Sequence, residues 1–140
     1  MSEVSEGAEG GRQGSVTHTV AEIEIDRKTD ALVGEWLTLR EAAERLGLDL
    51  KRVKQLLRDH KLLGVQRAEG LCVPAAFITG DQPLKGLQST LTVLADSGFD
   101  NVEALRWLFT EDASLPGTPV QALTQHRVKE INRRAQALAL

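Results

Sequence analysis

The stretch from residue 38 to residue 60 constrains the fold most, because it specifies two short helices separated by a tight turn. Thr38 and Glu41 have the spacing of a capping box, in which each side chain satisfies a backbone N–H group at the start of a helix. This first helix is expected to end at about Leu46, before Gly47. Its apolar residues recur at i, i+3, i+4 and i+7 and include two alanines, so a second helix can pack closely against it.

The second helix is expected to run from Leu50 to His60, because Asp49 is a favoured N-cap. A three-residue turn then separates the two helices, which is typical of a helix-turn-helix, whose second helix enters the major groove of DNA. Two β-prone runs follow, at residues 63–67 and 71–73, and predict a hairpin at the position of a wing. Pro74 ends the second run, since it has no N–H group to continue the ladder.

The flanking segments complete a mainly α winged helix-turn-helix with a short β-hairpin wing and a C-terminal helical extension. Residues 1–31 begin with a run rich in Gly, Ser and Glu, which predicts a disordered acidic tail. A short strand within residues 16–25 is the less favoured alternative, because the apolar residues there alternate imperfectly. We expect the winged helix-turn-helix domain at residues 32–79 and the helical extension, packed on it, at residues 80–140.

The extension is predicted to contain four helices, whose ends are marked by local signals. Those signals are Gly98 as a C-terminal cap, Asp100 with Glu103 as a second capping box, and Thr118 before Pro119 as an N-cap. The expected helices are residues 84–97, 101–109, 119–124 and 125–139.

The last helix has an apolar stripe and a cationic face, and each allows two interpretations. The stripe is Val128, Ile131, Ala135 and Leu138, which either completes the core, the favoured interpretation, or forms the seam of a homodimer. The outward cations, which would be a second phosphate-contacting surface, are Arg127, Lys129, Arg133 and Arg134.

Positive charge is concentrated where the helix-turn-helix is predicted, although the whole chain has a net charge of -3. Residues 1–35 have a net charge of -5, residues 36–67 of +4, and the remainder of -2. A basic segment in an otherwise acidic chain indicates a polyanionic partner at that segment. Double-stranded DNA is the expected partner.

The side chains of the second helix divide into an apolar side and a polar side. The apolar side consists of Leu50, Val53, Leu56 and Leu57. The residues expected to contact base edges, because Arg and Lys bind guanine and Gln binds adenine, are Lys51, Gln55 and Arg58. The residues expected to contact phosphates are Arg52, Lys54 and, on the first helix, Arg40. Arg67 on the wing is expected to reach the minor groove or a phosphate, against the opposing charge of Glu69.

Nothing in the sequence indicates catalysis, a cofactor or a metal site. The single cysteine, Cys72, cannot form an internal disulfide and is expected to be buried, and the three histidines lie far apart. We expect Trp36, Trp107 and Phe109 to be core residues. The chain has no apolar run long enough to span a membrane and no signal peptide, so a cytoplasmic, non-enzymatic protein is predicted.

The string LTLREAAERLGLDLKRVKQLLRDHKLLGVQRAEG, followed by VPAAF, resembles the winged helix-turn-helix of the MerR and excisionase type. From Trp36 onward the chain is also similar to a small actinobacterial DNA-binding family with a helical C-terminal extension, in the segments LQSTLTVLADSGF, EALRWLFTEDASL and HRVKEINRRAQALA. This resemblance implies a cytoplasmic DNA-binding regulator. The recognition residues it implies are Lys51, Arg52, Lys54, Gln55 and Arg58.

One member of that family is a substrate of a mycobacterial serine/threonine kinase, so kinase control is a further hypothesis. Thr17 and Thr19 in the predicted tail are the candidate phosphorylation sites. A phosphate adds about -1.5 to -2 charges, which would oppose binding to DNA. The rival interpretation is a protein-interaction adaptor or an antitoxin-like subunit, because residues 106–123 resemble the helical end of some antitoxins.

Overall fold

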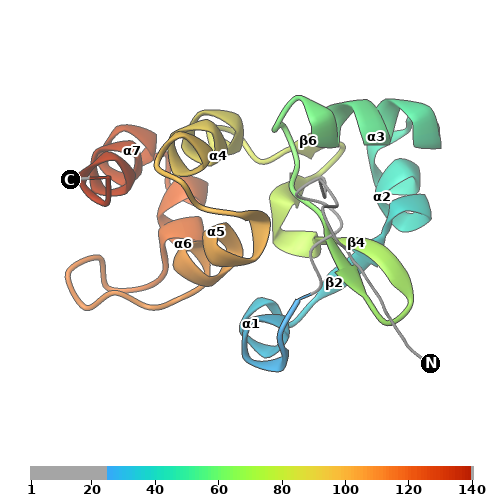
Figure 1. Cartoon of the computed structure of the whole chain (residues 1–140). Coiled ribbons are helices and arrows are strands. Elements are labelled where there is room, and N and C mark those ends of the chain that lie inside the picture. Colours follow the sequence, from blue (N-terminus) through green and yellow to red (C-terminus); the bar gives the residue numbers. More distant parts are fainter. Residues whose placement is uncertain (1–24, 140) are drawn as a thin grey trace, which may run out of the picture.

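The computed structural model describes residues 25–139, which form a mainly α winged helix-turn-helix with a β-hairpin wing and a C-terminal helical extension, as predicted (Figure 1). The helices are α1 (Arg27–Val33), α2 (Leu39–Leu46), α3 (Leu50–Arg58), α4 (Leu87–Asp96), α5 (Asn101–Leu108), α6 (Pro119–Thr124) and α7 (Val128–Ala137), with a 3₁₀ turn η2 (Ala75–Phe77). The strands are β2 (Trp36–Thr38), β3 (Val65–Arg67), β4 (Gly70–Pro74), β5 (Ile78–Thr79) and β6 (Gln82–Pro83).

Helices α2 and α3 begin where the capping signals predict. The Thr38 hydroxyl accepts a hydrogen bond from the Glu41 N–H at 3.1 Å, and the Glu41 carboxylate accepts one from the Thr38 N–H at 2.8 Å. Gly47 ends α2 in the left-handed conformation, with a φ of 69°. The Asp49 side chain then caps α3. These local bonds give the chain its sharp turn between the two helices.

Close packing of α2 against α3 fixes the orientation of α3. Ala42 and Ala43 of α2 are buried and small, so the two helices approach closely, and Val53 of α3 is fully buried. The sequence suggested that α3 runs to His60, but the helix ends at Arg58. His60 adopts a φ of 59°, which takes the chain out of the helix.

The wing is part of a three-stranded antiparallel sheet with the strand order β2-β4-β3. The hairpin of β3 and β4 matches the prediction, and Pro74 is the last residue of β4. Strand β2 was not predicted; its three residues pair with β4 from Trp36 opposite Pro74 to Thr38 opposite Cys72. A second hairpin, β5 with β6, occupies the connection to α4.

Helices α5 and α6 begin as predicted, with capping boxes at Asp100 and Thr118. Helices α4 and α7 start later than expected, at residues 87 and 128. Gly86 forms a tight turn before α4 and packs against α7, and His126, with a φ of 63°, breaks the helical path before α7. Gly86 has a φ of 87°, and a Cβ atom there would collide with a methyl carbon of Val128. Only glycine allows this approach of α7 to the start of α4.

The apolar stripe of α7 completes the core within the chain. Ile131 and Ala135 are fully buried, and α7 packs along α4. Leu138, expected in the same stripe, is 44% exposed because it lies just beyond the end of the helix. The buried part of the stripe is therefore not available as the seam of a dimer.

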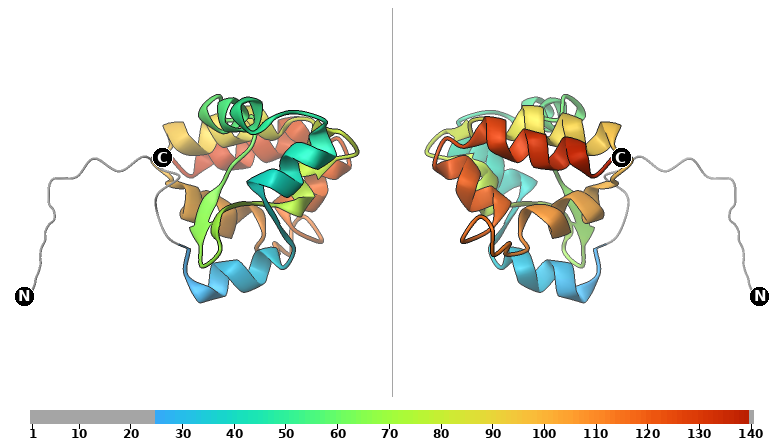
Figure 2. Two further views of the ribbon diagram at one scale, coloured as in Figure 1. Left: turned by 90° about the vertical axis from the view of Figure 1, so that its right-hand side faces the viewer. Right: turned by 90° about the vertical axis from the view of Figure 1, so that its left-hand side faces the viewer.

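Helix α1 corrects the prediction of a disordered tail up to residue 31. The Asp26 carboxylate accepts hydrogen bonds from the N–H and the hydroxyl of Thr29, at 3.3 and 2.7 Å, and Thr29 is fully buried. Arg106 of α5 donates to both residues at 3.3 Å. This seven-residue helix is held by α5, and Figure 2 shows it at the opposite end of the molecule from α3. The rest of the predicted tail, with its alternative strand, lies outside the described residues.

Candidate nucleic-acid interface

Helix α3 carries five of the predicted DNA-contacting side chains on its exposed side. At 3.6 residues per turn, Lys51, Gln55 and Arg58 lie within about 60° of one another around the helix. They lie opposite the fully buried Val53. The structure therefore brings the three predicted base-contacting residues together on one stripe. The two predicted phosphate-contacting residues on its flanks are Arg52 and Lys54, both exposed.

Hydrogen bonds along this stripe hold its polar side chains in order. Arg58 donates to the Gln55 side-chain oxygen at 2.8 Å, and the Gln55 amide nitrogen donates to the Asp59 carboxylate at 3.0 Å. All three side chains are exposed, so these bonds can exchange for bonds to bases at small cost. A carboxylate flanks the cationic surface at each end: Asp49 lies at the start of α3, and Asp59 follows its last residue.

Two further exposed residues lie near the starts of α2 and α3. Arg40 is exposed in the first turn of α2, as expected for a backbone contact. Leu50 was predicted to face inward but is 38% exposed, because it is the first residue of α3 and lies beyond the contact with α2. An exposed apolar side chain there suits the methyl group of thymine. Its position directly after the N-cap was the signal that could have identified it.

Arg67 contacts α1, β2 and the turn of the wing within the domain, and its expected groove contact stays a prediction. Its guanidinium donates to both carboxylate oxygens of Asp30, at 2.8 and 3.1 Å, and lies 4.7 Å from the centre of the Trp36 ring. A further contact at 3.3 Å joins it to Glu69. The hydrogen bonds to Asp30 raise the pKa of Arg67. These contacts hold the Arg67 side chain against α1 and β2.

The residues predicted to be structural are buried or packed against the core. Phe109 and Cys72 are buried, and Trp36 and Trp107 are half-buried beside the core. Burial raises the pKa of the Cys72 thiol, which disfavours its reactive thiolate form.

Two of the four cations on the predicted second cationic surface of α7 are paired with carboxylates of the chain itself. Glu130 accepts hydrogen bonds from Arg127 at 2.8 Å and from Arg134 at 3.0 Å, and these bonds lower the pKa of Glu130. Arg134 also pairs with Asp112. The remaining two cations of that surface, Lys129 and Arg133, are exposed.

The remaining predictions concern the phosphorylation sites, a membrane span and a metal site. Thr17 and Thr19 lie outside them, so the proposed phosphorylation sites stay predictions. Between residues 25 and 139 no helix has the length and apolar character needed to cross a membrane. In the same region, no group of His, Cys, Asp and Glu side chains is arranged to hold a metal ion.

Both halves of the chain match models of known protein families. The family model described as "DNA-binding protein Rv2175c, wHTH domain" matches residues 24–78, and that described as "Rv2175c C-terminal domain of unknown function" matches residues 84–139. The DNA-binding protein Rv2175c of Mycobacterium tuberculosis (strain ATCC 25618 / H37Rv) is 41% identical over 114 residues, covering 72% of this chain and 78% of that protein. The NMR structure of Rv2175c has a TM-score of 0.72 at 34% identity, covering 93% of this chain and 99% of that one. The chain therefore belongs to the Rv2175c family of winged helix-turn-helix proteins.

Proposed function

We propose that this protein binds double-stranded DNA with sequence selectivity and regulates transcription. One observation carries the proposal: α3 presents Lys51, Gln55 and Arg58 on one exposed stripe, held rigidly by the packing of α2 on Val53. A rigid helix with long donor side chains is what direct recognition in the major groove requires. The family model for this half of the chain, which is described as a DNA-binding protein, supports the same conclusion.

The proposed contacts divide by chemistry. The stripe of α3 extends over about 10 Å along the helix, which matches about three stacked base pairs. Lys51 and Arg58 donate to guanine, and Gln55 bonds to adenine. The residues proposed to bind phosphates, and so to supply affinity without sequence preference, are Arg40, Arg52 and Lys54.

Removing the two terminal cations of the stripe tests this proposal. In the Lys51→Ala/Arg58→Ala variant, affinity for a selected duplex should fall at least about 30-fold, because each base contact contributes about 1–3 kcal/mol. The matched control is Lys129→Ala/Arg133→Ala, which removes two exposed cations from α7 and should change affinity less than threefold. Equal losses in both variants would contradict the assignment of α3.

Salt dependence distinguishes DNA binding from a protein-interaction adaptor. Affinity for DNA should fall steeply with salt, and each phosphate contact removed should lower the slope of log K against log[salt] by about one. Arg52→Ala is expected to show this reduction. An adaptor would show no salt-dependent association with duplex DNA.

Kinase control of this DNA binding is the regulatory part of the proposal. Phosphate on Thr17 or Thr19 would add negative charge to a segment that already has an excess of acidic residues. DNA affinity of the phosphorylated protein should be lower than that of the unphosphorylated protein, and a variant with both threonines replaced by alanine should not respond to the kinase. An unchanged affinity after phosphorylation would refute this regulation.

A further inference from the structure

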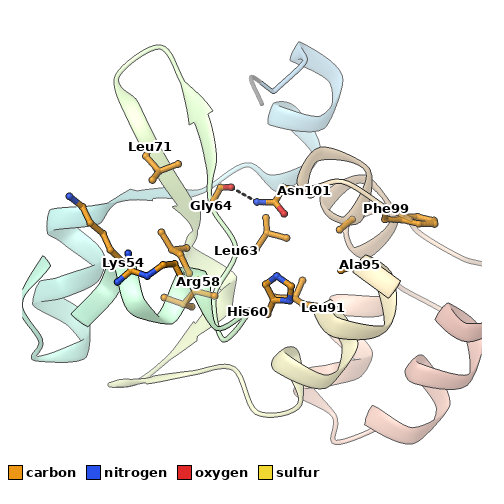
Figure 3. A pocket seen from close by; sticks show the side chains of 13 residues that line it. Lys54, Arg58, His60, Leu63, Gly64, Leu71, Leu91, Ala95, Phe99 and Asn101 are labelled. Carbon is orange, nitrogen blue, oxygen red and sulfur yellow. Dashed lines mark hydrogen bonds between the residues drawn. The ribbon is translucent and has the colours of Figure 1, made fainter. Parts of the chain in front are cut away.

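A cleft of about 420 Å³ lies between the DNA-facing half of the molecule and the helical extension (Figure 3). Its walls come from the end of α3 and the following loop, from the wing, and from α4 and α5. This volume lies in the range of about 300–1,000 Å³ that is typical of pockets for small organic ligands. The cleft thus joins the proposed DNA-binding element to the extension, to which the proposed function assigns no role.

The walls of the cleft are mainly aliphatic. Leucine side chains line it from α3, from the loop after α3, from the wing and from α4, and the half-buried ring of Phe99 lies on the side of the extension. Across the cleft, the Asn101 amide donates a hydrogen bond to the Gly64 carbonyl at 2.9 Å. This bond ties α5 to the strand side of the cleft, so the cavity is built into the fold.

One edge of the cleft is cationic. Lys54 and Arg58 lie one turn apart on α3, on the side of the lining opposite Ala95 and Phe99 (Figure 3). His60 also lines the cleft. None of the residues that line the cleft is acidic. Within residues 25–139, no carboxylate forms an ion pair with either of the two α3 cations. An occupant with one anionic end would therefore meet two neighbouring cations and no acidic residue in the lining of the cleft.

We propose that this cleft binds a small amphipathic carboxylate, with its aliphatic chain among the leucines and its carboxylate on Lys54 and Arg58. An arginine can donate two parallel hydrogen bonds to a carboxylate, which orients the ligand. Because both cations also belong to the α3 surface, the bound ligand competes with DNA. This competition rests on the proposed function, whereas ligand binding itself does not.

Octanoate tests the site on the full chain, with octanol as a probe of the same chain length that lacks the charge. Calorimetry should show octanoate binding, with octanol at least tenfold weaker. Ala95→Trp should weaken octanoate binding at least tenfold, because Ala95 is an exposed residue of α4 at the rim of the cleft. Ala95→Glu should also weaken octanoate binding, because it places a negative charge beside the aliphatic walls with less added bulk than tryptophan. Ala137→Trp, at another exposed alanine on α7 outside the cleft, is the matched control and should bind octanoate as the wild type does.

Competition is measured as the apparent Kd for DNA. At an octanoate concentration ten times the wild-type Kd for octanoate, the apparent Kd for DNA should rise about tenfold in the wild type and no more than about twofold in Ala95→Trp. The Ala95 variants should bind DNA normally without octanoate, since the α3 side chains are unchanged.

Three results would overturn this inference. Equal octanoate binding by the wild type and both Ala95 variants would place the ligand elsewhere, and equal binding of octanol would remove the role of the cations. A dimer that dissociates on Ala95→Trp would show that a second copy fills the cleft. Octanoate binding by a protein that binds no DNA would refute the proposed function while the ligand site stands.

Discussion

Arg67 can be tested directly, because a structural role and a DNA-contacting role for this side chain predict opposite results. The structure places its side chain, 19% exposed, against Asp30, 33% exposed, and over the Trp36 ring. These contacts join the wing to α1 and β2. Arg67→Ala removes all of them at once, and Arg67→Lys keeps the charge but loses the two-pronged pairing with Asp30 and much of the stacking.

The size of the effect follows from the partial burial of this cluster. Hydrogen bonds to buried charged groups contribute about 1.5–3 kcal/mol and exposed ion pairs about 0–1 kcal/mol, so a half-buried pair falls near 1–1.5 kcal/mol. The contact with the Trp36 ring adds about 0.5–1 kcal/mol. Arg67→Ala should therefore lower the free energy of unfolding by about 1.5–2.5 kcal/mol, and Arg67→Lys by about half as much. For a domain of this size, the former corresponds to a fall in Tm of roughly 5–10 °C.

Thermal unfolding and DNA binding should be measured on the same preparations. We expect Arg67→Ala to melt earlier but to bind DNA within twofold of the wild type at 25 °C, where both are folded. Arg133→Ala, which removes an exposed arginine of α7, is the control and should change neither property. An unchanged Tm combined with a tenfold or greater loss of DNA affinity would refute the structural role and restore the groove contact.

Three further predictions concern the core and the charges on it. Phe77 is fully buried, and its ring centre lies 5.7 Å from that of Phe109 in the other half of the chain. Phe77→Ala should therefore lower the free energy of unfolding in urea by about 3–5 kcal/mol, with both halves unfolding in one transition. Two separate transitions would contradict a shared core. The pKa of Glu130 is lowered in the folded state, so its contribution to stability should be complete above its unfolded value of about 4.3 and should vanish as pH falls through the folded pKa. Between pH 7 and 3 the wild type should therefore lose more stability than Glu130→Gln. Cys72 is buried with a raised pKa, so a thiol reagent should modify it slowly in the native protein and quickly in denaturant; equal rates would contradict its burial.

The sequence predicted those helix starts that depend on bonds within four residues. The Thr38 and Asp100 capping boxes lie in a single turn each, so their spacing alone locates the starts of α2 and α5. Helix α1 and strand β2 escaped prediction because each is short and depends on partners far along the chain. Thr29, for example, is buried by contacts with Arg106, 77 positions later.

The same distinction applies to the candidate site. The polar stripe of α3 follows from helical periodicity, so its residues can be identified from the sequence alone. The true environment of Arg67 could not, because its partner Asp30 is 37 positions away in a segment predicted to be disordered. Leu50 was misplaced because periodicity assigns a face but does not show where the contact with α2 ends.

Selection of bound sequences from a random duplex library tests most directly the claim that α3 recognises base edges. The library should be bound by the wild type, by Gln55→Ala and by Arg52→Ala under the same salt conditions. Gln55→Ala should relax the preference at one base pair, by about 1–3 kcal/mol, and leave the others intact. Arg52→Ala should weaken binding to all sequences alike and keep the wild-type preference. Identical preferences for the wild type and Gln55→Ala, or no enrichment at all, would contradict the account.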